Sequence, residues 1–147
     1  MSGLHAKKMV VPIDFSDLSF AALDRAVEIA GDSGEVHAIH VLTSLSAMEP
    51  GSMYGTVTDE TRIESVTKNL RKRLSDKKYA NVAVHAVVGD AGRSISDFAE
   101  QEGADLIVIS SHGYGFFQRL MLGSVAERVV RLAPCAVLVL RTLPEGT

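Results

Sequence analysis

The chain has 147 residues, 46% of them hydrophobic, and a formal net charge of −3. This length suits one hydrophobic core, so we expect residues 1–147 to form a single domain. The slightly acidic balance provides no overall attraction for nucleic acid or for an anionic membrane, and we expect neither as a partner.

The N-terminal residues have no apolar signal core, and no stretch approaches the roughly 18 continuous apolar residues of a membrane span. The single cysteine, Cys135, has no second cysteine with which to form an internal disulfide. These features predict a cytoplasmic protein.

Five apolar runs alternate with segments that have helical signals. Each run has the composition of a strand that is buried on both faces, and we expect strands at 9–13, 36–43, 82–88, 106–109 and 136–140. Four helices are expected between them: after a cap at Ser16, along the apolar stripe that ends at Leu74, after the turn at 89–92, and from Ser124 until Pro134.

This alternation predicts an α/β fold, with an open and mostly parallel sheet that carries helices on both faces. In such sheets, ligands bind beyond the carboxyl ends of the strands. The connection from residue 44 to residue 58 is long, and two interpretations stay open for it: a flap over the ligand, or a disordered insertion.

The stretch SSHGYGFFQRLMLGS, residues 110–124, begins at the end of the fourth strand. Gly113 permits a close backbone approach, and Gly123-Ser124 precedes the last helix. Ser124 with Glu127 fits the S-x-x-E capping box, which predicts a helix that starts there with its free N–H groups facing outward. The arrangement indicates a phosphate cradle of backbone N–H groups. The alternative is that the glycines only form turns and that Ser124 only caps the helix.

Other chemistries find less support. There is no G-x-x-x-x-G-K-[ST] motif and no G-x-G-x-x-G after the first strand. His37 and His40 point to opposite sides of a strand, which argues against a shared metal ion. Ser111 and His112 do not suggest acyl transfer, because adjacent side chains of an extended segment diverge and no G-x-S-x-G elbow is present.

Several strings of the sequence match a known family. The chain resembles the universal stress proteins, whose ATP-binding branch carries G-x-x-G, nine residues and G-[ST] after the fourth strand. The corresponding string here is Ser110-Ser111-His112-Gly113, nine residues, and Gly123-Ser124, so that serine replaces the first glycine. The resemblance extends to VVPIDFSDLS, IHVL, VVGDAGRSI, ADLIVISSHG, LMLGSVAERVVR and APCAVLVLR.

The resemblance implies the Rossmann-like, adenine nucleotide alpha hydrolase-like fold with sheet order 3-2-1-4-5. It also implies a homodimer through the C-terminal strand at 136–141 and a bound ATP, or AMP or ADP, with Mg²⁺ or Mn²⁺ beside the phosphates. The implied nucleotide-binding residues are Pro12, Ile13, Asp14 and Val41 for adenosine; Ile109, Ser110, His112 and Gly113 for the phosphate loop; and Gly123, Ser124, Val125 and Ala126 at the helix start. Asp14 also has a physical motive, since its carboxylate can accept hydrogen bonds from ribose hydroxyls or an adenine amine; the alternative is that it caps the next helix.

Two functions remain open because of Ser110. If its backbone position requires glycine, nucleotide binding is lost and the protein is a dimeric adaptor. If the position needs only an N–H donor, serine serves, and the protein is an ATP-binding, stress-response homodimer that signals to an unknown regulatory partner. Hydrolysis would then be slow at most, since no general base is evident and no catalytic residue is assigned.

Overall fold

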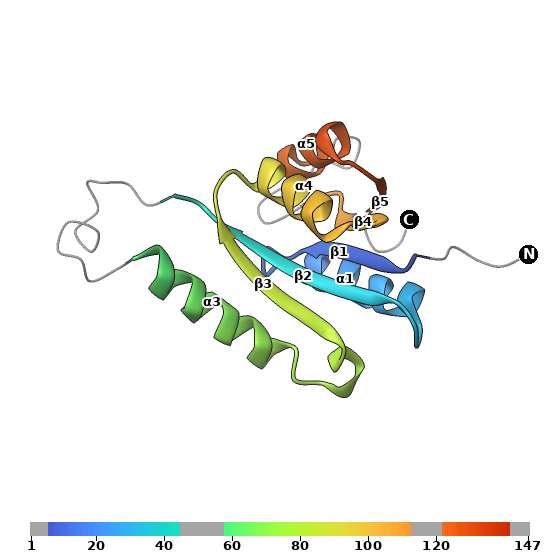
Figure 1. Cartoon of the computed structure of the whole chain (residues 1–147), viewed down its shortest axis with the longest axis horizontal. Helices are drawn as coiled ribbons and strands as arrows, with labels where there is room; N and C mark the ends of the chain where they lie inside the picture. The colour runs from blue at the N-terminus through green and yellow to red at the C-terminus, as the bar shows by residue number, and fades with distance from the viewer. Residues whose placement is uncertain (1–5, 45–57, 113–121, 142–147) are drawn as a thin grey trace, which may run out of the picture.

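The computed structural model describes residues 6–44, 58–112 and 122–141. Along the chain (Figure 1) the elements are β1 (Lys8–Pro12), α1 (Asp17–Ala30), β2 (Glu35–Leu42), α3 (Asp59–Arg73), a 3₁₀ turn (Lys77–Tyr79), β3 (Val82–Val88), α4 (Ala91–Glu102), β4 (Leu106–Ser110), α5 (Ser124–Leu132) and β5 (Ala136–Leu140). Each expected strand and helix is present, with strand ends that differ from the prediction by one residue at most. The stretch 45–57, which makes up most of the connection expected to be a flap or an insertion, lies outside the described residues.

The five strands form one parallel sheet in the order β3-β2-β1-β4-β5. The chain therefore has the open α/β architecture that the sequence predicts. The chain winds outward in one direction from β1 to β3 and in the other from β4 to β5. The connections that follow β1 and β4 therefore run to opposite faces of the sheet and leave a crevice at its carboxyl edge.

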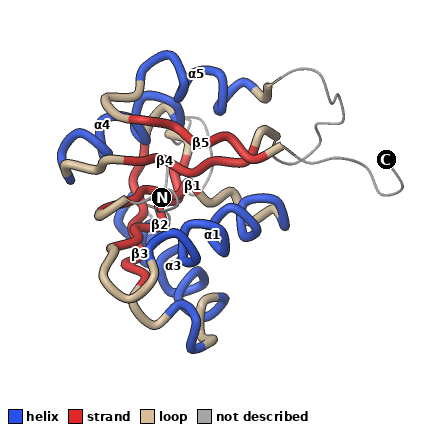
Figure 2. Tube along the Cα trace, turned by 90° about the vertical axis from the view of Figure 1, so that its right-hand side faces the viewer, coloured by secondary structure: helices blue, strands red, loops and turns tan. Residues whose placement is uncertain are grey.

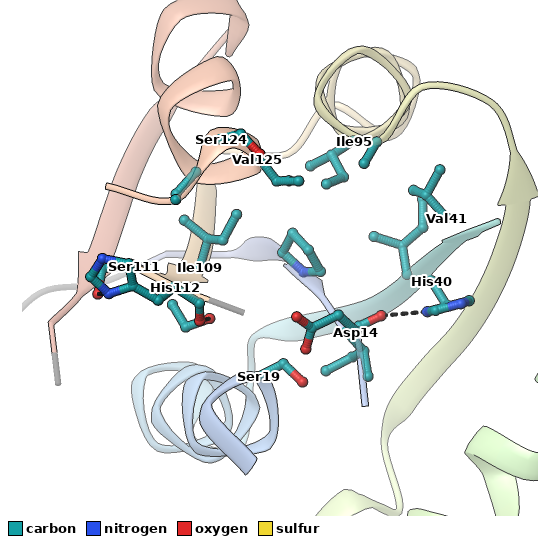
Figure 3. Close-up of a pocket in the computed structure, with 17 residues that line it drawn as sticks. Asp14, Ser19, His40, Val41, Ile95, Ile109, Ser111, His112, Ser124 and Val125 are labelled. Atoms are coloured by element: carbon teal, nitrogen blue, oxygen red, sulfur yellow. Dashed lines mark hydrogen bonds between the residues drawn. The ribbon is translucent and has the colours of Figure 1, made fainter. Parts of the chain in front are cut away.

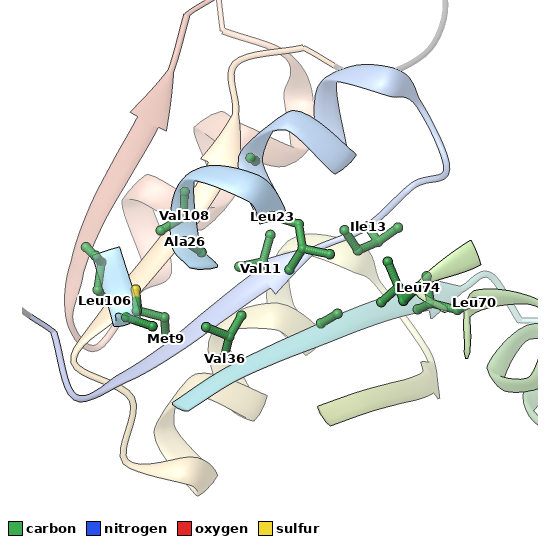
Figure 4. Close-up of a cluster of buried hydrophobic side chains, with 13 residues drawn as sticks. Met9, Val11, Ile13, Leu23, Ala26, Val36, Leu70, Leu74, Leu106 and Val108 are labelled. Atoms are coloured by element: carbon green, nitrogen blue, oxygen red, sulfur yellow. The ribbon is translucent and has the colours of Figure 1, made fainter. Parts of the chain in front are cut away.

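Side chains that alternate along the strands fill two cores, one on each face. Met9 and Val11 of β1 face α1 and α3, whereas Val10 faces α4 and α5. Figure 2 shows the sheet between these two helical layers, and Figure 4 shows the core beneath α1, to which Leu23, Leu70 and Leu74 contribute. Because both faces are covered, the stretches 9–12 of β1 and 106–109 of β4 are continuous apolar runs.

Polar caps start three of the helices. The Ser16 side chain accepts from the Ser19 N–H at α1, Thr58 accepts from Thr61 at α3, and Asp90 accepts from Arg93 at α4. Helices of a parallel sheet begin at its carboxyl edge, so the caps place the starts of α1 and α4 beside the crevice. None of the helices in the described ranges has the length and apolar character that crossing a membrane requires.

Candidate functional site

A pocket of about 380 Å³ lies at the carboxyl edge of the sheet, where β1, β2 and β4 end (Figure 3). All of the site residues implied by the sequence line it, except Gly113, which lies outside the described residues. Its lining consists of Pro12, Ile13, Asp14, Ser19, Ile39, His40, Val41, Ala91, Ile95, Ile109, Ser110, Ser111, His112, Gly123, Ser124, Val125 and Ala126. The volume is within the range of small-molecule sites.

The turn between β1 and α1 presents a carboxylate at one side of the pocket. Asp14 accepts hydrogen bonds at Oδ1 from the Ser16 N–H, at 3.0 Å, and from the Ser16 hydroxyl. Its Oδ2 accepts no hydrogen bond from the residues that the structure describes, and the residue is exposed. Asp14 is therefore held in orientation by one oxygen and has the other available for a ligand.

The start of α5 lies on the opposite side of the pocket, where Figure 3 shows Ser124 and Val125. The capping-box prediction is wrong here, because Gly123 is the N-cap and no side chain caps the helix. The helix does begin at Ser124, as expected, but the Glu127 N–H donates to the Gly123 carbonyl at 2.9 Å, which makes Gly123 the N-cap. The Gly123 N–H donates to the Ser111 carbonyl at 2.7 Å, and the Glu127 carboxylate accepts from Arg131 at 2.7 Å.

This correction leaves the α5 terminus more available than the sequence suggested. The N–H groups of Ser124, Val125 and Ala126 donate to no acceptor among the described residues. Unsatisfied N–H groups and the helix dipole together favour an anion at this place.

Ser110 occupies its position without the backbone angles that favour glycine. Phe15 alone, among the described residues other than glycine, has a positive φ. The Ser110 hydroxyl donates to the His112 carbonyl at 3.0 Å and thereby closes a local turn at the end of β4. The backbone conformation therefore gives no reason for a glycine at Ser110.

Ser111 and His112 contact each other, contrary to the expectation that they diverge. The Ser111 Oγ lies 3.1 Å from Nδ1 of His112, and both residues are buried. The sequence argument failed because β4 ends at Ser110, so the two residues are no longer in an extended strand. Ser111 is 2% exposed and its carbonyl binds Gly123, which ties it to the framework of the site.

Residues that the sequence did not assign complete the pocket. Ala91 and Ile95 come from α4, Ile39 and His40 precede Val41 on β2, and Ser19 comes from the first turn of α1. Adjacency to Val41 at a strand end was a usable signal for His40, whereas the α4 residues are brought in by helix packing.

In the described part of the chain, no three His, Cys, Asp or Glu side chains are grouped to hold a metal ion, and Asp14 is the carboxylate that lines the pocket.

Comparison with known proteins identifies the family to which a chain with this site belongs. The model of the universal stress protein family matches residues 5–141. The chain belongs to the universal stress protein family. It is 34% identical over 141 residues to universal stress protein MJ0531 of Methanocaldococcus jannaschii, covering 92% of this chain and 82% of that protein. It is 32% identical over 147 residues to universal stress protein YxiE of Bacillus subtilis, covering 91% and 98%.

Solved structures of universal stress proteins share the fold. UspA from Lactobacillus plantarum superposes with a TM-score of 0.76 at 27% identity, covering 95% of this chain and all of that one. A universal stress protein in complex with cAMP has a TM-score of 0.67 at 24% identity, covering 95% and 100%. One from Archaeoglobus fulgidus in complex with dAMP has a TM-score of 0.59 at 24% identity, covering 92% and 98%. The likeness confirms the adenine nucleotide alpha hydrolase-like fold.

Proposed function

We propose that this universal stress protein binds an adenine nucleotide, ATP or else AMP or ADP, in the pocket, and that it acts as a homodimeric regulator. The observation that carries the proposal is the pairing of an oriented carboxylate, Asp14, with an uncapped helix terminus at Ser124 across one pocket. A nucleotide has the complementary ends: hydroxyls or an amine that donate to a carboxylate, and phosphates that accept from N–H groups.

The wall between these two ends suits a flat base. Ile13, Ile39, Val41, Ile95 and Val125 give it an apolar lining. A purine buries apolar surface there while its polar edge reaches the strand ends, which is the usual division of roles in a small-molecule site. The complexes with cAMP and dAMP concern other proteins of this fold, so the proposal rests on the pocket of this chain.

The conformation at Ser110 favours nucleotide binding over the adaptor function. Neither a positive φ nor an unsatisfied hydroxyl is present at this residue. A divalent cation, Mg²⁺ or Mn²⁺, would accompany the phosphates and take water for most of its ligands, since magnesium retains several waters in such sites. Turnover is slow at most in this proposal, and the bound nucleotide serves as a signal.

Isothermal titration of protein freed of copurified nucleotide tests the proposal. We expect saturable heat with ATP in the micromolar range, and no heat at concentrations up to about 1 mM would overturn it. GTP and adenosine serve as comparison ligands, since GTP varies the base and adenosine lacks the phosphates.

A charge placed at the start of α5 separates binding from folding. Ser124→Asp adds a negative charge beside the uncapped N–H groups, which stabilises a helix terminus by about 0.3–1 kcal/mol while repelling phosphate. We expect weaker ATP binding, unchanged adenosine binding and an undiminished melting temperature. The neutral isostere Ser124→Asn is the matched control. Equal ATP affinity of the two variants would contradict a phosphate position at this helix.

A further inference from the structure

His40 stands out among the pocket residues because its side chain binds the backbone just beyond the end of β1. Its Nδ1 lies 2.6 Å from the Ile13 carbonyl oxygen, the contact drawn as a dashed line in Figure 3. A carbonyl oxygen only accepts, so Nδ1 carries the proton and donates it. This contact assigns the tautomer of His40 in its neutral form.

The hydrogen bond gives a donor to the Ile13 carbonyl, which is not paired within the sheet. β1 ends at Pro12, and the Ile13 N–H still donates to the Ile39 carbonyl at 2.8 Å, whereas its own carbonyl lies beyond the ladder. His40 supplies the missing donor from the neighbouring strand. Ile13 is thereby held on both sides, directly before Asp14.

The next residue explains why such an anchor is needed. Phe15 has a φ of 66°, a conformation that a bulky side chain adopts rarely and that needs support from its surroundings. Its ring packs edge to face on His40 at 5.0 Å between centroids, and on Phe20 at 6.2 Å. His40 therefore contacts the turn before and after Asp14.

We propose that His40 is a positioning residue of the nucleotide site, which acts by holding the turn at 13–15 so that the Asp14 carboxylate faces the ligand. The inference rests on the proposed function for the identity of the ligand. The role within the turn rests on the hydrogen bond to Ile13 and the contact with Phe15 alone.

Two replacements of similar size separate the hydrogen bond from packing. His40→Leu removes the donor, whereas His40→Asn places an amide nitrogen at the same number of bonds from Cα as Nδ1. We expect His40→Leu to weaken ATP binding about tenfold, the effect of losing one hydrogen bond that orients a binding group, and His40→Asn to stay within about threefold of the unmodified chain. Equal losses in both variants would overturn the inference.

A double-mutant cycle tests whether the effect passes through Asp14. In an Asp14→Ala background, His40→Leu should alter ATP affinity by less than about twofold, since the group that it positions is gone. Full additivity of the two losses would contradict a positioning role.

Hydrogen exchange of the Ser16 amide gives a measurement that needs no ligand, because this amide donates to Asp14. We expect faster exchange in His40→Leu and unchanged exchange in His40→Asn. Unchanged exchange in His40→Leu would overturn the inference whatever the protein binds. Faster exchange in a chain that binds no adenine nucleotide would support the anchor and refute the proposed function.

Discussion

Nδ1 of His37 lies 2.9 Å from Nε2 of His85, and the two rings stack with their centroids 5.1 Å apart. They come from neighbouring strands, β2 and β3, and pack against Phe98 of α4. In this hydrogen bond one ring nitrogen donates and the other accepts. If both rings were protonated, every ring nitrogen would be a donor and the bond would be lost, whereas one added proton leaves an acceptor in the pair.

The stability of the protein should therefore fall in mild acid. Burial is the largest cause that lowers the pKa of His85 below 6.5, followed by the charge of His37; Arg71 also lowers it and Glu102 opposes the shift. Just below pH 6.5 the unfolded chain binds more protons than the folded one, so the free energy of unfolding decreases as the pH falls through this window. Urea denaturation at about pH 7.5 and about pH 5.5 measures the difference.

His85→Gln is the matched variant for this prediction, since it removes the titrating group and retains a polar side chain. We expect a shallower pH dependence in this variant. Glu35 lies 3.6 Å from the otherwise unpartnered Nε2 of His37 and would partly offset the charge of a protonated His37. The same slope in both proteins would show that the pair does not carry the acid sensitivity.

Ser110→Gly should leave ATP affinity nearly unchanged. The serine has no positive φ, and its hydroxyl already binds the His112 carbonyl. The substitution removes this hydrogen bond and adds backbone entropy to the unfolded chain. Together these effects should lower the free energy of unfolding by about 1–2 kcal/mol. Titration and urea denaturation of the same samples test both parts. A gain in affinity of more than about tenfold would show that serine obstructs the site.

Gly92→Ala should destabilise the protein although alanine favours helices. A Cβ at Gly92 would lie 2.5 Å from Cγ of Arg128, whose Nε donates to Asp90 at 2.9 Å. The clash displaces Arg128, and overpacking of this kind costs about 1–3 kcal/mol. Cβ of Arg128 would also lie only 2.8 Å away, so the relieving background must remove that atom too. In an Arg128→Gly background the same substitution should become neutral or stabilising by up to about 1 kcal/mol. Thermal denaturation of the four proteins measures this reversal, and a cost in both backgrounds would contradict it.

The homodimer predicted through 136–141 is testable at one backbone group. Ala136, Leu138 and Leu140 alternate with Val137 and Val139 on β5, and the Leu140 carbonyl accepts from Ser111 on the β4 side. The Val139 N–H therefore points to the open edge of the sheet. Val139→Pro removes that donor and leaves the bonds to β4 intact. Light scattering should give twice the chain mass of 15.7 kDa for the original protein and one chain mass for the variant.

A matched control for the dimer prediction is Val139→Thr, which retains the N–H. We expect this variant to remain dimeric and Val139→Pro to retain the circular dichroism of the original fold. A dimer that persists in the proline variant would exclude pairing through this edge.

The sequence predicted the sheet well because its central strands β1 and β4 are buried on both faces. Runs such as 9–13 and 106–109 have no polar residue that could obscure them, and each is followed by an unambiguous turn or cap. The residues at the strand ends were identifiable for the same reason: a parallel sheet gathers the ends of its strands at one edge.

The features of the site that the sequence did not predict depend on contacts between segments that are distant in the chain. An S-x-x-E pattern describes Ser124 as a cap and as a first helical residue equally well. The first intrahelical bond, from the Glu127 N–H to the Gly123 carbonyl, makes Ser124 the first helical residue. The place of His40 beside Val41 is a local signal that it lines the pocket, but its contact with the β1–α1 turn is visible only in its bond to Ile13, 27 positions earlier in the chain. Ile95 reaches the pocket because α4 packs over β2, which no local pattern records.

The bond between the Ser111 carbonyl and the Gly123 N–H joins the chain where it departs from β4 to the place where it returns at α5. This hydrogen bond holds the end of β4 and the start of α5 together directly, although 11 residues separate Ser111 from Gly123 along the chain. One backbone contact therefore sets how far the N–H groups at the start of α5 lie from the end of β4, and with it the distance between two walls of the pocket.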